Sequence, residues 1–208
     1  IEHSKKMSVQ PRAIGSASVC VKADAQGKTR IERLRQSGAS KLVFPHARRK
    51  DADVVLVNTA GGITGGDDFK LDIKVQTRAA LTLTTQAAER AYRAQPDEVG
   101  QVNTKAHVHS GASFHWLPQE LILFNRSALT RTLTVDLEQD ARFLMVEPIA
   151  FGRAAMGETL SEVMFEDRIR VFRDGIPIYL DGMTLTGHAG AHLARGAIGG
   201  GAGAMASV

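Results

Sequence analysis

The segment LDIKVQT, residues 71–77, alternates apolar and polar side chains from one position to the next. A period of two places successive side chains on opposite faces, which is typical of a β-strand with one buried and one solvated face. The same pattern recurs in LTLT (81–84) and LTVDL (133–137). We therefore predict a mainly β protein built from layered or superhelical antiparallel and mixed sheets.

Two other segments, VVLV (54–57) and FLMV (143–146), are continuous apolar runs. Short runs of this kind are typical of strands buried on both faces.

Helix signals are few. The best is QAAERAYR (86–93), which is rich in helix formers and is followed by Pro96. We expect one or two short helices and see no internal repeat of fixed period.

A hairpin is expected near the end of the chain. Two apolar segments, 169–173 and 176–180, flank Asp174 and Gly175, a dipeptide that tolerates the positive φ angles of a type I′ turn. Pro177 cannot donate a backbone hydrogen bond, so its strand should lie at the edge of a sheet.

Length and composition indicate one globular domain spanning residues 1–208, with 43% hydrophobic and 23% charged residues. The single cysteine, Cys20, excludes an internal disulfide and fits a reducing cytoplasm. No apolar run approaches the roughly 18 residues of a membrane span, so we expect a soluble, cytoplasmic protein with no membrane partner. Residues 1–6 precede Met7 and read either as an expression remnant or as a natural start without its methionine.

The net charge of +4 is a small imbalance between 26 basic and 22 acidic residues. The densest basic segment, 48–50, reads as a solvated loop, and the few aromatic residues do not interleave with arginines. We predict no nucleic-acid partner.

The glycine-rich segment NTAGGITGGDD (58–68) follows an apolar run, as a phosphate-binding loop would. Its spacing matches neither the dinucleotide fingerprint nor the P-loop, and Asp67 and Asp68 would repel a phosphate. Three interpretations remain open: a structural turn, a contact with a partner or a metal path, and an enzyme that binds a phosphorylated ligand at residues 60–68. Gly62 and Gly65 are expected to be needed for their backbone geometry.

His107 and His109 lie two positions apart in an expected strand, so both should point to one face, as a metal-binding pair could. A solvated strand face is the other interpretation. His115 is nearby, but its direction cannot be read from the sequence.

No nucleophile motif is present, and Cys20 lies in a strand-like stretch without a feature that would activate its thiol. The acidic residues are more informative. Four of them lie in or beside apolar, Gly or Pro segments, where a carboxylate is costly to bury unless it is paired or binds a cation. They are Glu89, Glu120, Glu147 and Glu158.

Five blocks of sequence, taken in order, resemble the UreD (UreH) urease accessory protein family. They are RLRQSGASKL with FP (33–42 and 44–45), VNTAGGITGGD (57–67), TTQAAERAYR (84–93), WLPQELILF (116–124) and FGRAAMGE (151–158).

The resemblance implies a mainly β protein without catalysis of its own that binds UreF, with the GTPase UreG recruited to that pair. It implies docking on apo-urease, a dimer of such heterocomplexes formed through UreF, and no permanent cofactor. It also implies nickel in transit along an internal tunnel. On that path the resemblance suggests Asp67, Glu89, Glu147 and Glu158, with Glu120 and Asp181 behind them.

The chain departs from the family at its end, because family members usually continue for several dozen residues. Here the sequence stops in a glycine-rich stretch, of which residues 197–204 read as a loop or a frayed end. We expect the family's C-terminal segment to be missing.

Overall fold

The structure is a computed structural model that describes residues 10–45 and 50–208. In these residues the chain forms three β-sheets, one short α-helix, α1 (Ala189–Leu193), and one 3-10 turn, η1 (Ala154–Met156). The prediction of a mainly β protein with mixed sheets is confirmed. The described part of the chain contains no helix with the length and apolar character that a membrane crossing needs.

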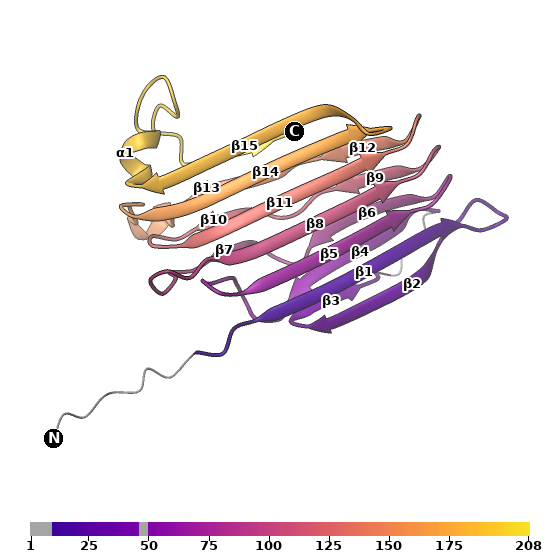
Figure 1. Cartoon of the computed structure of the whole chain (residues 1–208), viewed down its shortest axis with the longest axis horizontal. Coiled ribbons are helices and arrows are strands. Elements are labelled where there is room, and N and C mark those ends of the chain that lie inside the picture. Colours follow the sequence, from indigo (N-terminus) through magenta and orange to yellow (C-terminus); the bar gives the residue numbers. More distant parts are fainter. Residues whose placement is uncertain (1–9, 46–49) are drawn as a thin grey trace.

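The largest sheet has seven strands in the order β15-β14-β11-β8-β5-β1-β2, which Figure 1 shows stacked side by side. Its inner strands pair in parallel, and an antiparallel strand closes each edge. The strands are β1 (Ile14–Ala23), β2 (Thr29–Gly38), β5 (Asp68–Val75), β8 (Gly100–Val108), β11 (Ala128–Leu137), β14 (Val163–Arg173) and β15 (Ile176–Gly187).

Two smaller sheets complete the fold, in the orders β12-β9-β6-β4-β3 and β16-β13-β10-β7. The five-stranded sheet contains β3 (Ser40–Val43), β4 (Ala52–Asn58), β6 (Ala80–Thr85), β9 (Ser113–Trp116) and β12 (Arg142–Met145). The four-stranded sheet contains β7 (Glu89–Ala91), β10 (Leu121–Leu123), β13 (Glu147–Phe151) and β16 (Ala204–Ser207).

Successive turns of the chain visit the three sheets in the same order, which makes the fold solenoid-like. The strands β5, β6 and β7 form one turn, β8, β9 and β10 the next, and β11, β12 and β13 a third. Each turn stacks on its neighbour by parallel pairing, so each buries its inner side chains against the next. The turns begin at residues 68, 100 and 128, and this unequal spacing explains the lack of a fixed sequence period.

Side chains that point inward form two apolar clusters. The larger is built around Leu83, Val108 and Phe114, and the smaller around Leu123 and Phe165; all five side chains are fully buried. Removing apolar surface from water is the main stabilising contribution to such a fold.

The alternation in residues 71–77 is confirmed, because buried and exposed residues alternate along β5. The hairpin is also confirmed. Strands β14 and β15 pair in antiparallel fashion around Asp174 (φ 48°) and Gly175 (φ 77°), and β15, which carries Pro177, lies at the sheet edge.

The helix predicted at 86–93 is wrong. Residues 89–91 form strand β7, in which Glu89 is the parallel partner of Leu121 in β10. The short apolar strand β10 offers backbone partners to this segment and buries Ala91, and this tertiary pairing outweighs helix propensity.

Burial on both faces was also wrong for the two apolar runs. Strand β12 lies at the edge of the five-stranded sheet and leaves Leu144 45% exposed, with only Met145 buried. In β4 only Val54 is fully buried.

The loop expected at 197–204 is confirmed for residues 197–203. The chain end is not frayed, because β16 pairs with β13. Residues 1–6 and two members of the basic segment, 48 and 49, lie outside the described residues.

Candidate functional site

A cavity of about 90 Å³ lies between the seven-stranded sheet and the two smaller sheets. Residues of both apolar clusters line it, and polar groups form a seam between them. The polar residues of the lining include Ser40, Asn58, Glu89, Thr104, Arg131 and Glu147.

Arg131, Glu147 and Asp167 form a buried ion-pair triad beside this cavity. The Arg131 guanidinium lies 2.7 Å from Glu147 Oε2 and donates through Nε and Nη2 to both oxygens of Asp167, at 2.9 and 2.5 Å. Trp116 Nε1 donates to the second oxygen of Glu147. One guanidinium therefore serves two carboxylates, and the ionised triad carries one net negative charge.

Burial by itself would lower the pKa of Arg131, but the adjacent Glu147 and Asp167 carboxylates outweigh that effect and raise the pKa above its ordinary value. The guanidinium stays charged. The sequence argument for Glu147 was that a buried carboxylate needs a cation, and the structure supplies Arg131.

Glu89 is the first residue of β7 and is half-buried. Its Oε2 accepts a hydrogen bond from Asn58 Nδ2 at 3.2 Å, and its Oε1 accepts one from the Arg90 N–H at 3.1 Å. Desolvation raises the pKa of Glu89 above its ordinary value despite these bonds. Neither partner neutralises the carboxylate. Within residues 10–45 and 50–208 no guanidinium binds Glu89, in contrast to Glu147.

Two further hollows flank the cavity. One, of about 80 Å³, shares Leu56, Asn58, Thr85 and Glu89 with it. The other, of about 550 Å³, lies between β13, β15 and the C-terminal residues, and its lining includes Asp167 and Asp181. Glu89 lines both the cavity and the smaller hollow. The cavity and the larger hollow share no lining residue among those described, but Arg131 pairs with Glu147 of the cavity and with Asp167 of the larger hollow.

Three of the six sequence-predicted carboxylates line these hollows: Glu89 and Glu147 the central cavity, and Asp181 the larger hollow. Asp181 is exposed on β15 and accepts hydrogen bonds from the hydroxyls of Tyr179 and Ser207 at 3.2 Å.

Asp67, Glu120 and Glu158 do not line any of the three hollows. Glu158 is held by Arg153, whose side-chain hydrogen bonds at 2.9 and 3.0 Å lower the pKa of the carboxyl to about 2. Glu120 is half-buried, and its backbone carbonyl accepts the Glu89 N–H at 2.9 Å.

Asp67 closes the glycine-rich loop. Its carboxylate accepts the backbone N–H groups of Ala13 and Thr64, both at 2.8 Å. Gly62 has φ 154°, and a β-carbon there would lie 2.2 Å from the Tyr92 ring. Gly65 has no positive φ, but a β-carbon would lie 2.6 Å from the Glu98 carbonyl oxygen. The need for glycine at position 65 therefore comes from the close approach of the Glu98 backbone.

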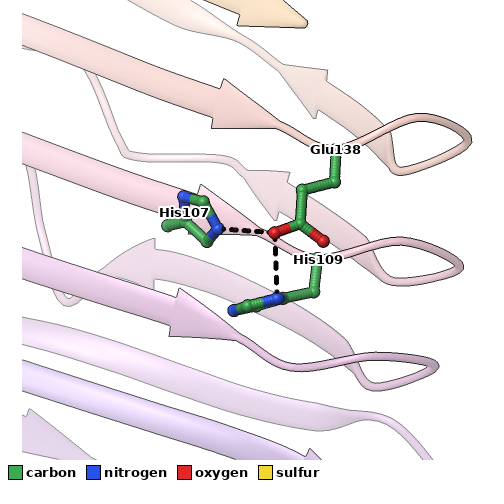
Figure 2. Close-up of side chains that lie close together, drawn as sticks. All are labelled: His107, His109 and Glu138. Atoms are coloured by element: carbon green, nitrogen blue, oxygen red, sulfur yellow. Dashed lines mark hydrogen bonds and ion pairs between the residues drawn. The ribbon is translucent and has the colours of Figure 1, made fainter. Parts of the chain in front are cut away.

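His107 and His109 do point to one face, as predicted, and both approach Glu138 in the loop after β11 (Figure 2). His115 is elsewhere, in β9, with Nδ1 3.4 Å from the Thr82 hydroxyl.

A model of the UreD urease accessory protein family matches residues 13–208. The chain belongs to the UreD family. Similar proteins include the urease accessory protein UreD of Roseobacter denitrificans, 52% identical over 202 residues that cover 96% of this chain and 72% of the relative. The UreD of Ruegeria sp. is 51% identical over 91% of this chain and 64% of its own length. The UreD of Brucella suis is 44% identical over 88% of this chain and 65% of its own length. The chain thus spans about two thirds to three quarters of the length of these UreD proteins.

Sequence reasoning missed Arg131 and Asp167, although a signal was present. In β11 the buried positions are Leu129, Leu133, Val135 and Leu137, and Arg131 falls on the same alternation. Asp167 falls on the buried alternation of β14 and is the register partner of Arg131. In each strand a charged residue stands at a position that the alternation assigns to the buried, apolar face. That pattern would have indicated the ion pair in the UreD interior.

Proposed function

We propose that this protein acts in urease maturation, in the cytoplasm, as a non-enzymatic scaffold that binds UreF, with UreG recruited to that pair, and apo-urease. The scaffold forms a dimer of heterocomplexes through UreF and conducts nickel through its interior. The observation that carries the proposal is the set of carboxylates that line the three hollows, Glu89, Glu147, Asp167 and Asp181. Membership of the UreD family supports the same role.

The charges of this set favour passage of a divalent cation. Glu89 lines both the cavity and the smaller hollow, and no guanidinium of the described part of the chain binds it. Its raised pKa reflects a desolvated carboxylate that gains from a cation. The Arg131 triad links Glu147 of the cavity to Asp167 of the larger hollow and carries a net negative charge, but its guanidinium also repels an arriving cation. Because Asp167 binds Arg131 through two nitrogens, Glu147 can exchange Arg131 for the ion while Arg131 stays paired.

Carboxylates bind late first-row divalent ions less tightly than imidazole or thiolate ligands do. A path made of separated carboxylates therefore holds nickel weakly at each point and releases it, whereas a closed site of His and Cys ligands would retain it. In this proposal Glu89, Glu147, Asp167 and Asp181 are the path. Asp67, Glu120 and Glu158 support the surrounding backbone.

The test is the double variant Glu89→Leu with Glu147→Leu. We expect it to assemble with UreF and apo-urease but to lower urease activity and bound nickel after activation by tenfold or more. The control is Glu166→Leu, on the opposite face of β14 from Asp167. A double variant that assembles and activates urease as well as the wild type would refute the path and leave the carboxylates structural.

Partner binding has its own support in the exposed apolar residues of β15, namely Ile176, Ile178, Tyr179 and Leu180. A cluster of large exposed apolar side chains on an edge strand is typical of an interaction surface. We expect the chain to be poorly soluble alone and to co-elute with UreF in size-exclusion chromatography. A monodisperse monomer that ignores UreF would contradict this part of the proposal.

The rival function, an enzyme that binds a phosphorylated ligand at residues 60–68, is disfavoured because several N–H groups of that loop already have acceptors and two carboxylates lie in it. The Thr64 N–H is taken by Asp67, and Asp68 pairs with Lys70 at 2.7 Å. A rise in the unfolding midpoint with nucleotides, without any effect of UreF, would favour the rival.

A further inference from the structure

The outer face of the seven-stranded sheet carries a cluster of two imidazoles and one carboxylate. Ala106 and Val108 of β8 are buried in the core, so His107 and His109 project from the opposite face. Glu138 follows the last residue of β11, the neighbouring parallel strand. Figure 2 shows both rings directed at one oxygen of its carboxylate. None of the three residues lines the internal cavity.

The three ligand atoms are spaced as a metal site requires. His107 Nε2 lies 3.0 Å and His109 Nδ1 lies 3.1 Å from Glu138 Oε1, and one ligand atom from each residue falls within 4.8 Å of the others. Metal–ligand distances of about 2.1 Å separate adjacent ligands by about 3.0–3.4 Å in octahedral or tetrahedral coordination. An ion fits between these atoms after small side-chain movements.

The backbone holds the carboxylate in place. The Ser110 N–H donates to the other oxygen of Glu138 at 3.1 Å, and Asp140 accepts both the Ser110 hydroxyl and the Gly111 N–H at 2.7 Å. The loop after β8 is thereby fixed against the loop after β11. Hydrogen bonds of this kind orient metal ligands from outside the coordination sphere.

The His109 ring has a hydrogen-bonding conflict. Its Nε2 is buried without a hydrogen-bond partner among the described residues. A proton on Nδ1 satisfies Glu138 but leaves the Nε2 lone pair buried, whereas a proton on Nε2 turns the Nδ1 lone pair towards an anionic oxygen. A cation between Nδ1 and Glu138 removes the repulsion in the second tautomer, while Nε2 stays without a partner among the described residues in both tautomers.

The flanking charges are mixed. Lys74 and Asp136 are the register partners of His107 on the two neighbouring strands, one positive and one negative. The wider hollow that His107 lines also holds Arg33, Arg35 and Lys105 against Asp72. A bound cation therefore depends on the Glu138 carboxylate for its charge compensation.

We propose that His107, His109 and Glu138 bind a late first-row divalent metal ion such as Zn²⁺ or Ni²⁺. Imidazole with one carboxylate suits these ions, and the half-buried position leaves the remaining coordination sites to water. The bound ion is exchangeable and lies across the sheet from the internal carboxylates. The inference does not rest on the proposed nickel path.

The test is equilibrium dialysis of the full chain against Zn²⁺ and, separately, Ni²⁺, followed by metal analysis. We expect His107→Ala and His109→Ala each to weaken binding of one equivalent by tenfold or more, and the exposed His192→Ala to leave it unchanged. Glu138→Gln keeps the shape of the side chain and should also weaken binding, so the proposal stays testable if a histidine variant fails to fold.

Visible absorption of Co²⁺ bound to the wild type should show bands that the His107→Ala variant lacks. The Glu89→Leu with Glu147→Leu variant should retain the ion, because its substitutions lie inside the fold. Equal affinity in the wild type, His107→Ala and Glu138→Gln would overturn the inference, as would an equal loss in His192→Ala.

Discussion

The two faces of the seven-stranded sheet use the same kinds of charged groups for different purposes. On the inner face, Arg131 and two carboxylates are buried together and satisfy one another. On the outer face, Glu138 lies beside two partly exposed histidines and has no guanidinium partner among the residues that the structure describes. Because burial makes an unpaired charge costly, the inner groups contribute to whether the chain folds, and the outer groups contribute to what it can bind.

The largest effect should come from breaking the inner triad. Arg131→Met leaves Glu147 and Asp167 buried without a cation, and we expect a loss of about 3–5 kcal/mol in the free energy of unfolding. Chemical denaturation measures this. The matched control is Arg168→Met on β14, whose guanidinium is half-exposed and pairs with Glu166. Exposed pairs contribute little, so comparable losses in the two variants would contradict the assignment.

A second variant sharpens the same comparison. Replacing Arg131, Glu147 and Asp167 together by Met, Leu and Leu removes all three charges. We expect this triple variant to be more stable than Arg131→Met alone, because no charge is then left unpaired. A triple variant less stable than the single one would mean that packing of the side chains, rather than charge, dominates this region.

The glycine loop beside the inner face comes next. Gly62→Val combines a positive φ with a clash against Tyr92, and we expect it to cost about 1–3 kcal/mol and to lower soluble yield. Gly65→Val should behave similarly through its contact with Glu98. Gly203→Ala, where a β-carbon meets nothing within 4 Å, is the control. Denaturation midpoints equal to the wild type in both Val variants would refute the close approach.

Replacing Glu89 should change the free energy of unfolding by a smaller amount and in the opposite direction. Its pKa is raised in the folded state, so the folded chain holds its proton more tightly and stability falls as pH rises from 4.5 through the raised pKa. Glu89→Gln should therefore be at least as stable as the wild type at neutral pH and lose this part of the pH dependence. Thermal unfolding across the acidic to neutral range checks it. A destabilised Glu89→Gln with unchanged pH dependence would contradict the desolvated carboxylate.

The strands could be predicted from the sequence because alternation is a local property. Residues 71–77 follow the pattern of β5, and the Asp174–Gly175 turn fixes the β14–β15 hairpin. The strand at 89–91 could not be predicted, because its partner β10 lies some thirty positions away and overrides the helix propensity of the segment.

The candidate sites follow the same rule. The spacing of His107 and His109 predicts a shared face, but Glu138 joins them only through the register of β8 with β11. Likewise, the sequence context of Glu147 predicts a need for a cation, but Arg131 is supplied by β11 and is held in turn by Asp167 of β14. Residue type and local pattern predict that a side chain needs a partner, and strand register determines which residue is that partner.

The smallest effect should come from the outer face. The Ser110 N–H and the neighbouring His107 lower the pKa of Glu138 below its ordinary value of 4.5. The folded state therefore favours the ionised form, and the resulting stability is present above pH 4.5 and lost as pH falls through the lowered pKa. Because the carboxylate is partly exposed, water screens this contribution, and Glu138→Gln should shift the unfolding midpoint less than any variant above. The shift should vanish in acid, where the wild-type carboxyl is protonated. A midpoint that falls as far as in Arg131→Met would show that Glu138 is structural, and the contrast between the two faces would fail.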